Sequence, residues 1–259
     1  MGKIISVANQ KGGVGKTTTA VNLAAAVAKA GKLVLIVDSD PQGNSTSSFG
    51  LSKQDCVTTT YELLTAEKPI DINFAIIKTS FKNIHIIPSS MNLAAAEIEL
   101  SEEPDRIVKL KKLLSVVCDK YDFIFIDCPP ALGLVTLNDL TASHTVLIPI
   151  QCEYFALEGL SQLVSTIKQV KKTSNPALEI EGVLMTMFDG RLNLTMQVAE
   201  EVKKYFPKKV YKTVIPRNVK ISEAPSFGMP VIYFDPSSKG TKAYIDLAKE
   251  FLKDNKRAK

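Results

Sequence analysis

Apolar residues along this 259-residue chain fall into short unbroken runs, separated by longer segments in which they recur at helical spacing. Runs that are apolar on both faces are typical of strands in a parallel sheet that is covered by helices on both sides. On this basis we predict strands at residues 3–8, 33–37, 84–87, 123–126, 145–150, 183–187 and 210–215.

Helical spacing fills most of the gaps between these runs. The alanine-rich stretch 17–30 ends at Gly31 and joins the first two strands into a β-α-β unit. Further helices are predicted at residues 106–118, 157–170, 194–205 and 241–253, the last with an apolar face that would dock on the core. Residues 44–71, rich in serine and threonine, give no clear signal. The alternation predicts an α/β fold, a doubly wound, mostly parallel sheet flanked by helices, in a single domain of residues 1–259.

Composition narrows the class of protein. The chain is 45% hydrophobic, enough for a full core, and no run of about 18 apolar residues predicts a membrane span. The four cysteines form no C-x-x-C pair, and with two histidines they give no recognisable zinc or redox spacing. We therefore expect a reduced, cytoplasmic protein.

The sequence KGGVGKTT, residues 11–18, connects the first strand to the first helix. Such a turn aims backbone N–H groups and the positive end of a helix at an anion. Glycines at 12, 13 and 15 would let the backbone wrap around phosphate, Lys16 would reach the β- and γ-phosphates, and the Thr17 hydroxyl would bind Mg²⁺. Gln10 stands where the strict phosphate-loop pattern requires glycine, and Lys11 is a lysine more than the loop needs.

A dinucleotide-binding loop is the competing interpretation. Gly13 and Gly15 match the first two glycines of G-x-G-x-x-G, but Thr18 occupies the third position. Asp38 could act as the ribose-binding acid of that fold, yet Lys16 and Thr17 would have no role in it. A nucleoside triphosphate is therefore favoured over NAD.

Three acidic residues follow predicted strands. Asp127 ends the strand 123–126, where an aspartate can hold a Mg²⁺-bound water, and Asp38 and Asp40 follow the strand 33–37. Strand ends converge on the ligand crevice in such sheets, so a carboxylate there can orient an attacking water or the metal shell. Capping of a strand end by Asp127, and turn formation by Asp38, are the structural alternatives.

Six motifs occur in order between about Lys3 and Phe251: KGGVGKTT, DSDPQGN, FIFIDCPPALGL, PIQCEYFALEGL, VIPRN and SEAPSFGMPV. Together they closely resemble the ParA/Soj chromosome-partition ATPases, a branch of the deviant-Walker-A family of P-loop proteins that also includes MinD. The resemblance implies an ATPase that uses ATP/ADP and Mg²⁺, hydrolyses ATP slowly and acts in chromosome or plasmid partition.

The resemblance also implies roles for individual residues. The lysine that matches Lys11 reaches across a face-to-face dimer to phosphates bound by the partner subunit, Asp40 matches a residue that positions water for hydrolysis, and Pro216 and Asn218 match positions that hold the adenine. The predicted catalytic residues are Asp40, Lys11, Lys16 and Asp127. The predicted nucleotide contacts are Lys11, Gly12, Gly13, Val14, Gly15, Lys16, Thr17, Thr18, Pro216 and Asn218. The metal candidates are Thr17, Asp127 through water, and Asp38.

Positive charge is concentrated in residues 191–220, which hold eight basic and two acidic residues, a local charge of +6 in a chain of +5. Clustered basic residues supply salt-dependent phosphate contacts without sequence preference, although a solvated helix face is the alternative. With the resemblance, this segment predicts nonspecific DNA binding, a nucleoid location and a ParB-type centromere-binding partner. The predicted DNA contacts are Arg191, Lys203, Lys204, Lys212, Arg217 and Lys220.

Two other functions are compatible with parts of the sequence. A MinD-like ATPase that cycles on membranes and positions the division machinery would need a free amphipathic helix at the C-terminus, but the tail 253–259 is polar and the preceding apolar face is short. A carrier resembling nitrogenase reductase would need paired cysteines for a shared cluster. No stable membrane association is expected.

Overall fold

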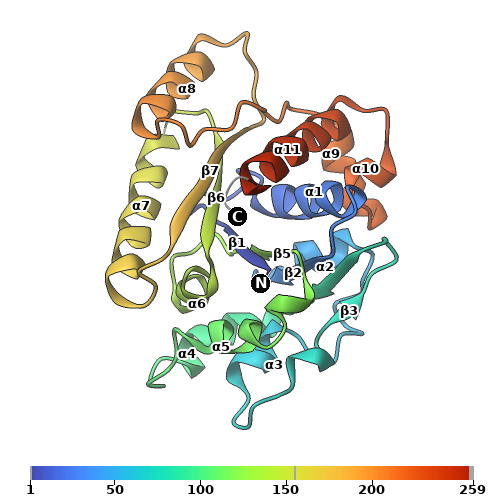
Figure 1. Ribbon diagram of the computed structural model, residues 1–259, viewed down its shortest axis with the longest axis vertical. Helices are drawn as coiled ribbons and strands as arrows, with labels where there is room; N and C mark the ends of the chain where they lie inside the picture. The colour runs from blue at the N-terminus through green and yellow to red at the C-terminus, as the bar shows by residue number, and fades with distance from the viewer. Residues whose placement is uncertain (1, 155, 257–259) are drawn as a thin grey trace.

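A seven-stranded sheet forms the centre of the computed structural model, which describes residues 2–154 and 156–256 (Figure 1). The strands are β1 (Lys3–Val7), β2 (Val34–Asp38), β3 (Ile77–Lys78), β4 (Ile84–Ile87), β5 (Phe123–Asp127), β6 (Thr145–Gln151) and β7 (Glu179–Thr186). Their order is β3-β4-β2-β5-β1-β6-β7, and only the edge pair β3 and β4 is antiparallel. The predicted doubly wound, mostly parallel sheet is confirmed.

Helices cover both faces of this sheet. The α-helices are α1 (Lys16–Lys29), α2 (Asn44–Ser48), α3 (Thr60–Thr65), α4 (Ala96–Glu99), α5 (Lys109–Ser115), α6 (Leu134–Ala142), α7 (Ala156–Thr173), α8 (Asn193–Tyr205), α9 (Val219–Glu223), α10 (Val231–Phe234) and α11 (Lys239–Lys256). The described residues also form the short 3₁₀ helices η1 (Ile72–Phe74), η2 (Met91–Ala95), η3 (Cys118–Lys120) and η4 (Ala224–Phe227). In Figure 1, α1, α9, α10 and α11 lie on one side of the sheet and α5 to α8 on the other.

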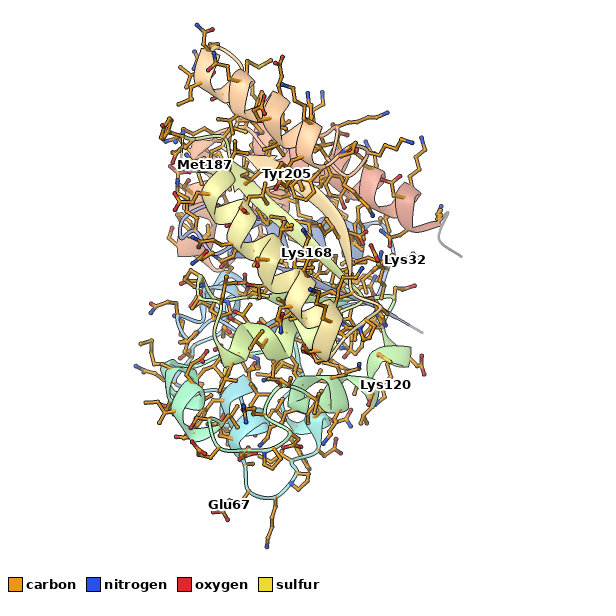
Figure 2. The ribbon with its side chains drawn as sticks, turned by 90° about the vertical axis from the view of Figure 1, so that its left-hand side faces the viewer. Lys32, Glu67, Lys120, Lys168, Met187 and Tyr205 are labelled. Carbon is orange, nitrogen blue, oxygen red and sulfur yellow. The ribbon has the colours of Figure 1, made fainter. Side chains whose placement is uncertain are left out.

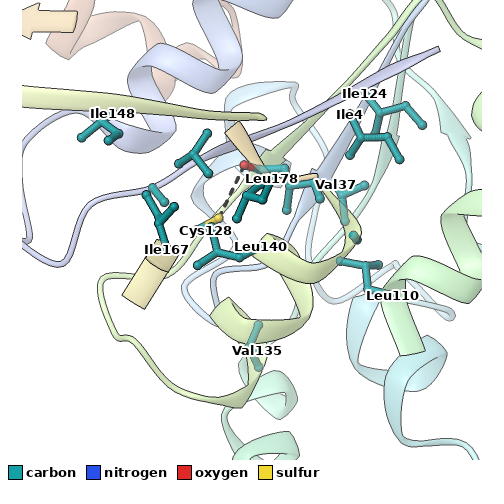
Figure 3. Packing of buried hydrophobic residues seen from close by; sticks show 14 of the residues in the cluster. Ile4, Val37, Leu110, Ile124, Cys128, Val135, Leu140, Ile148, Ile167 and Leu178 are labelled. Atoms are coloured by element: carbon teal, nitrogen blue, oxygen red, sulfur yellow. Dashed lines mark hydrogen bonds between the residues drawn. The ribbon is translucent and has the colours of Figure 1, made fainter. Parts of the chain in front are cut away.

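The core consists of two buried clusters, one on each face of the sheet. Successive strand residues alternate between them: Ile4 and Ile124 belong to the first cluster, whereas Ile5 and Phe125 belong to the second. Figure 3 shows part of the first cluster, where the Cys128 thiol also donates a hydrogen bond of 3.8 Å to the carbonyl of Ile126. Burial on both faces explains why the strands have uninterrupted apolar runs.

The prediction of a strand at residues 210–215 is wrong. Only isolated bridges form there, between Val183 and Val210 and between Phe188 and Pro216. The backbone N–H groups of Lys212 and Thr213 instead donate to the carboxylate of Glu250 on α11, at 2.7 and 2.9 Å. Tyr211 N–H donates to Val183 on β7, so the next donor that a continuous ladder would need is that of Thr213, which Glu250 takes. The segment therefore makes only separate backbone bonds to β7 and forms no strand.

The remaining differences are local. Residues 44–71, which gave no clear signal, contain α2 and α3, and α3 begins at a capping box made by Thr59 and Glu62. The helix predicted at 106–118 is shorter, because only residues 109–115 are α-helical before η3 begins. The two-residue edge strand β3 was missed, since so short a strand leaves no periodic pattern. The other predicted strands and helices are confirmed within a few residues.

The C-terminal helix α11 packs along α1, and both lie on the same face of the sheet (Figure 1). Tyr244, Leu247 and Phe251 on its apolar face are almost fully buried. Its predicted docking on the core is therefore confirmed, while residues 257–259 of the polar tail lie outside the described residues. Across the described chain, no helix combines the length and apolar character needed to cross a membrane.

Candidate nucleotide site

The loop between β1 and α1 depends on glycine for its conformation. Gly13 and Gly15 have φ values of 74° and 88°, in the left-handed region that side chains disfavour, and Gly15 directly precedes α1. Gly12 and Gly13 are exposed, Val14 is buried, and Thr17 and Thr18 lie half-buried in the first helical turn. The first N–H groups of α1 have no partners within the helix, so this loop is suited to hold an anion.

Lys16 is folded over this loop. Its ammonium donates to the carbonyl of Lys11 at 3.1 Å, and the residue is only 7% exposed. Burial lowers the pKa of Lys16, while the neighbouring Asp127, Cys128 and Asp40 oppose that shift. The side chain thus places a cation between the loop and the carboxyl groups of the adjacent strands.

Two of the predicted acids are brought together by strand register. Asp38 at the end of β2 is paired with Asp127 at the end of β5, and both are fully buried. Asp38 accepts hydrogen bonds of 2.7 Å from both the backbone N–H and the hydroxyl of Thr46, and Asp127 accepts one of 2.8 Å from Ser45. Burial raises the pKa of both carboxyl groups, and their hydrogen bonds oppose the rise. Repulsion from Asp40 raises the pKa of Asp38 further, and repulsion from Asp38 and Asp40 does the same for Asp127.

The carboxyl groups of Asp38 and Asp127 suit a site in which protein side chains and nucleotide phosphates bind the same metal ion. Asp127 Oδ1 is buried without a hydrogen-bond partner among the described residues, and the nearby Thr17 hydroxyl opposes the rise in the pKa of Asp127. No group of three or more histidine, cysteine or acidic side chains in the described chain is arranged as a protein-only metal site. Mg²⁺ in phosphate-handling sites is typically held by one or two carboxylates together with substrate phosphates, and Asp127, with its unpartnered Oδ1, fits that role. Both oxygens of Asp38 already accept hydrogen bonds, from Thr46 and from the Asp40 N–H.

Asp40 lies beyond β2 and is 7% exposed. Its Oδ1 accepts a hydrogen bond of 2.9 Å from the backbone N–H of Gln42, which fixes the carboxylate within the turn that leads to α2. The same turn delivers Ser45 and Thr46 to the buried acids. The prediction from sequence missed these two hydroxyl residues, although serine and threonine just after an acidic strand end are a usable signal.

Lys11 points away from its own loop. Its backbone N–H donates to Asn9 Oδ1 at 3.0 Å, and Asn9 Nδ2 in turn donates to the carbonyl of Pro149 on β6 at 2.7 Å. The Lys11 ammonium lies 2.6 Å from Glu153 Oε2, in the segment that follows β6. Lys11 is therefore held at the rim of the loop, whereas Lys16 is folded over the loop.

A cleft of about 400 Å³ lies beside the loop. Thr17 and Thr18 line one side, Pro225, Ser226 and Met229 of the SEAPSFGMPV motif line another, and α2 contributes Asn44, Ser47 and Ser48. Two sequence motifs separated by some 200 positions therefore share one cleft.

Pro216 lies beside the end of β7, and Asn218 follows two residues later at the start of α9. Thr186, the last residue of β7, donates a hydrogen bond of 2.8 Å to the Val14 carbonyl, and the bridge from Phe188 to Pro216 begins two residues later. Asn218 caps α9 by accepting a hydrogen bond of 3.3 Å from the Ile221 N–H. Thr186 was not predicted, because nothing local in the sequence connects it to the loop.

The six predicted DNA contacts are all exposed, but the structure does not gather them into one compact patch. Lys203 and Lys204 lie on α8, which packs into the first core cluster, whereas Lys220 lies on α9, which packs into the second. Figure 2 shows Met187, just before this basic segment, and Tyr205, within it, in the half of the molecule opposite Glu67. Several cations are compensated: Arg191 donates to Asp189 at 2.8 and 2.6 Å, and Lys204 and Lys220 pair with Glu201 and Glu223.

Comparisons with known proteins agree with this architecture. A family model described as an AAA domain matches residues 2–180. The chain is 58% identical over 250 residues to the sporulation initiation inhibitor protein Soj of Bacillus subtilis, covering 96% of this chain and 98% of that protein. It is 49% identical over 253 residues to the chromosome partitioning protein ParA of Myxococcus xanthus, covering 98% and 89%. The crystal structure of cobyrinic acid a,c-diamide synthase from Mycobacterium smegmatis, with bound ADP and magnesium, superposes with a TM-score of 0.86 at 34% identity, covering 100% and 97%.

The parallel sheet, the glycine-dependent loop and these matches define the class: the chain is a P-loop ATPase. Within that class, the full-length similarity to Soj and ParA is decisive. The chain belongs to the ParA/Soj family of chromosome-partition ATPases. The predictions of the fold, of the enzyme class and of this family are confirmed.

Proposed function

We propose that this partition ATPase works as an ATP-gated dimer that binds DNA without sequence preference and moves DNA cargo during segregation. The observation that carries the proposal is the separation of the two loop lysines, since Lys16 folds over its own loop while the Lys11 ammonium is held at the rim. A cation at the rim would reach phosphates bound by a second copy of the chain once it leaves Glu153. ATP would then favour the dimer, and loss of the γ-phosphate would weaken it.

ATP, ADP and Mg²⁺ are the cofactors of this ATPase, and each predicted residue has a task in holding them. The backbone of residues 12–18 and the Lys16 ammonium bind the phosphates, and Pro216 and Asn218 hold the adenine. Thr17 and Asp127, with Asp38 as a further candidate, hold Mg²⁺, which neutralises phosphate charge when bound. Asp40 orients the attacking water.

The basic segment supplies the DNA-binding surface in this proposal. Arg191, Lys203, Lys204, Lys212, Arg217 and Lys220 are all exposed, which phosphate contacts require. Because these residues are spread over both helical layers, with α8 and α9 both in the upper half of Figure 1, a dimer would present two such surfaces to one duplex. Binding would therefore be weak for one copy and strong for two, which couples DNA retention to ATP.

Slow turnover and a stimulating partner complete the proposal. An arginine finger accelerates phosphoryl transfer by about 10³- to 10⁵-fold, and no residue of this sequence identifies itself as one. A ParB-type centromere-binding protein would raise the rate and so release the dimer from DNA. The protein would accordingly be found on the nucleoid in the ATP state.

Membrane cycling is not favoured over DNA binding. The apolar face of α11 is occupied by its contact with α1, and Tyr244 and Phe251 are each no more than 1% exposed. An amphipathic helix must present such a face to lipid. Cosedimentation with liposomes and with DNA, each in the presence of ATP, separates the two functions.

The decisive experiment is to size the protein by light scattering with ADP, ATP and a nonhydrolysable ATP analogue, with and without random-sequence DNA. We expect a monomer with ADP, a dimer with the analogue, and a DNA-bound dimer when the duplex is added. Arg191→Glu should weaken binding to unrelated duplexes alike and flatten its salt dependence, whereas Lys68→Glu, next to Glu67 at the far end in Figure 2, should do so far less. A protein that stays monomeric with the analogue would contradict the proposal.

A further inference from the structure

The ion pair between Lys11 and Glu153 joins two segments that are 142 positions apart in the chain. Both follow the C-terminal ends of neighbouring strands, β1 and β6. The Asn9 side chain fixes this arrangement, because it accepts from the Lys11 N–H and donates to the carbonyl of Pro149. Glu153 is itself held in a tight turn, its N–H donating to the Gln151 carbonyl at 2.8 Å and its carbonyl accepting from Ala156 at 2.9 Å. The meeting of the two side chains is thus set by the fold.

The Lys11 ammonium cannot hold this position and also reach a phosphate on another subunit. Its side chain is 36% exposed and that of Glu153 is 47% exposed, so the pair can open without unfolding anything around it. Exposed ion pairs are weak, each contributing about 1.4- to 5-fold in an equilibrium constant. A weak pair of this kind opposes the release of Lys11 without preventing it.

We propose that Glu153 is a positioning residue that holds Lys11 within its own subunit and so raises the ATP concentration at which two copies pair. This inference rests on the proposed function of Lys11 as a cation donated to the partner's nucleotide. Two such pairs must open for each dimer formed. The carboxylate therefore weakens dimer formation by the square of the single-pair factor, about 2- to 25-fold.

The same arrangement gives the ATP switch a defined resting state. With Glu153 as its counter-ion, Lys11 has a partner in the monomer, and the rim of the loop is not a bare positive charge that would attract any polyanion. A ligand displaces Glu153 only if it attracts Lys11 more strongly than a single carboxylate does. The densely charged triphosphate of a second subunit is such a ligand. Lys11 is therefore released from Glu153 only when nucleotide is bound to the opposite subunit.

The test is the dimer dissociation constant measured by sedimentation with the nonhydrolysable ATP analogue and Mg²⁺. We expect Glu153→Gln to tighten the dimer by about 2- to 25-fold, and Glu153→Asp, which keeps the charge on a shorter side chain, to lie between it and the wild type. Glu158→Gln is the matched control, because it removes one exposed carboxylate from the first turn of α7, five positions away. The control should leave the dissociation constant within about 1.5-fold of wild type.

A second measurement asks whether Glu153 acts through Lys11. In a Lys11→Gln background, Glu153→Gln should no longer tighten any residual association of two copies. In the monomer, a double-mutant cycle of the two substitutions followed by urea unfolding should show a coupling of about 1.4- to 5-fold in the unfolding equilibrium constant. If the wild type forms a dimer but Glu153→Gln matches Glu158→Gln or weakens pairing, the holding role is overturned while the proposed function stands. A wild type that never pairs would overturn both.

Discussion

The hydroxyl of Thr186 donates a hydrogen bond of 2.8 Å to the carbonyl of Val14, which joins the last residue of β7 to the middle of the phosphate loop. Thr186 is 3% exposed, and its methyl group lies close to Gly15. The loop is therefore braced from the side by a strand that reaches the sheet more than 170 positions later. The chain leaving this strand turns at Met187, a non-glycine residue with φ of 48°, and continues to Arg191. One side chain thus connects the nucleotide loop to the start of the basic segment.

Thr186→Val keeps the shape of this side chain and removes its donor. A buried hydrogen bond of this kind contributes about 1 kcal/mol, so ATP affinity measured by calorimetry should fall by about fivefold if the brace holds the loop in its binding conformation. Thr166→Val, which removes a local hydrogen bond on the exposed side of α7, should leave ATP affinity unchanged. Equal affinities in the two variants would show that the loop needs no support from β7.

Lys16→Ala should abolish nucleotide binding. The substitution removes the ammonium that the fold buries against the loop beside Asp127 and Asp40, and with it the predicted contact to the β- and γ-phosphates. Calorimetry with ATP and Mg²⁺ measures the loss, and circular dichroism checks that the variant is folded. Lys172→Ala, an exposed lysine near the end of α7, is the charge-matched control. Wild-type affinity in Lys16→Ala would remove the phosphate-loop assignment.

Asp40→Ala should retain ATP but hydrolyse it far more slowly. The variant should then accumulate as a DNA-bound dimer, because the γ-phosphate that favours pairing is no longer lost. Phosphate release and light scattering with ATP and DNA give the two readouts. Asp55→Ala, which removes an exposed acid that lies outside the predicted site residues, should behave as wild type. If Asp40→Ala stayed monomeric with ATP, the link between hydrolysis and dimer release would be wrong.

Glu181 ties three parts of the chain together and gives a pH-dependent contribution to stability. It accepts from Lys3 at 2.5 Å and from Asn255 at 2.7 Å, and its side chain is 6% exposed. Glu181→Gln leaves the Lys3 ammonium without its counter-charge, and we expect the free energy of unfolding to fall by about 3 kcal/mol at pH 7. Glu179→Gln on the same strand, whose carboxylate is 62% exposed beside Lys171, should cost less than about 1 kcal/mol.

The pH dependence of this effect has a definite sign. Although burial alone would raise it, the pKa of Glu181 is lowered from its ordinary 4.5 because Lys3, with Thr145 and Asn255, favours the ionised form. A carboxyl group with a lowered pKa stabilises the fold fully above its unfolded value and loses that contribution as pH falls through the folded value. The difference in stability between wild type and Glu181→Gln should therefore be constant above about pH 5.5 and shrink below the ordinary pKa. A difference that grew in acid would contradict the ion pair.

Asp189→Asn should strengthen DNA binding. The two bonds from Arg191 hold the pKa of Asp189 at about 2, so the carboxylate is ionised at neutral pH and offsets the charge of Arg191. Removing it should raise affinity for unrelated duplexes several-fold at low salt and steepen the salt dependence by up to about one unit of slope. Asp55→Asn is the matched control, and fluorescence anisotropy at several salt concentrations makes the comparison. Unchanged binding would place Arg191 outside the DNA surface.

The sequence was most informative where structure is local. The loop from Lys11 to Thr18 forms between a strand and a helix that are adjacent in the chain, so glycine spacing and apolar pattern alone predict it. The strands bearing Asp38 and Asp127 were also predicted, because burial on both faces leaves uninterrupted apolar runs. Contacts across the chain were beyond this reasoning. Glu250 captures the N–H groups of residues 212 and 213, and Glu153 captures Lys11, and neither partner is marked by any pattern near the residue it binds.

The strand register that sets Asp38 beside Asp127 has a consequence for the stability of the folded protein. Two buried acids on adjoining strands repel one another, and both the repulsion and the loss of hydration weigh against folding. Whatever neutralises them, a proton or a divalent ion with its nucleotide, stabilises the whole domain through mass action. The temperature of unfolding should therefore rise when magnesium nucleotide is added.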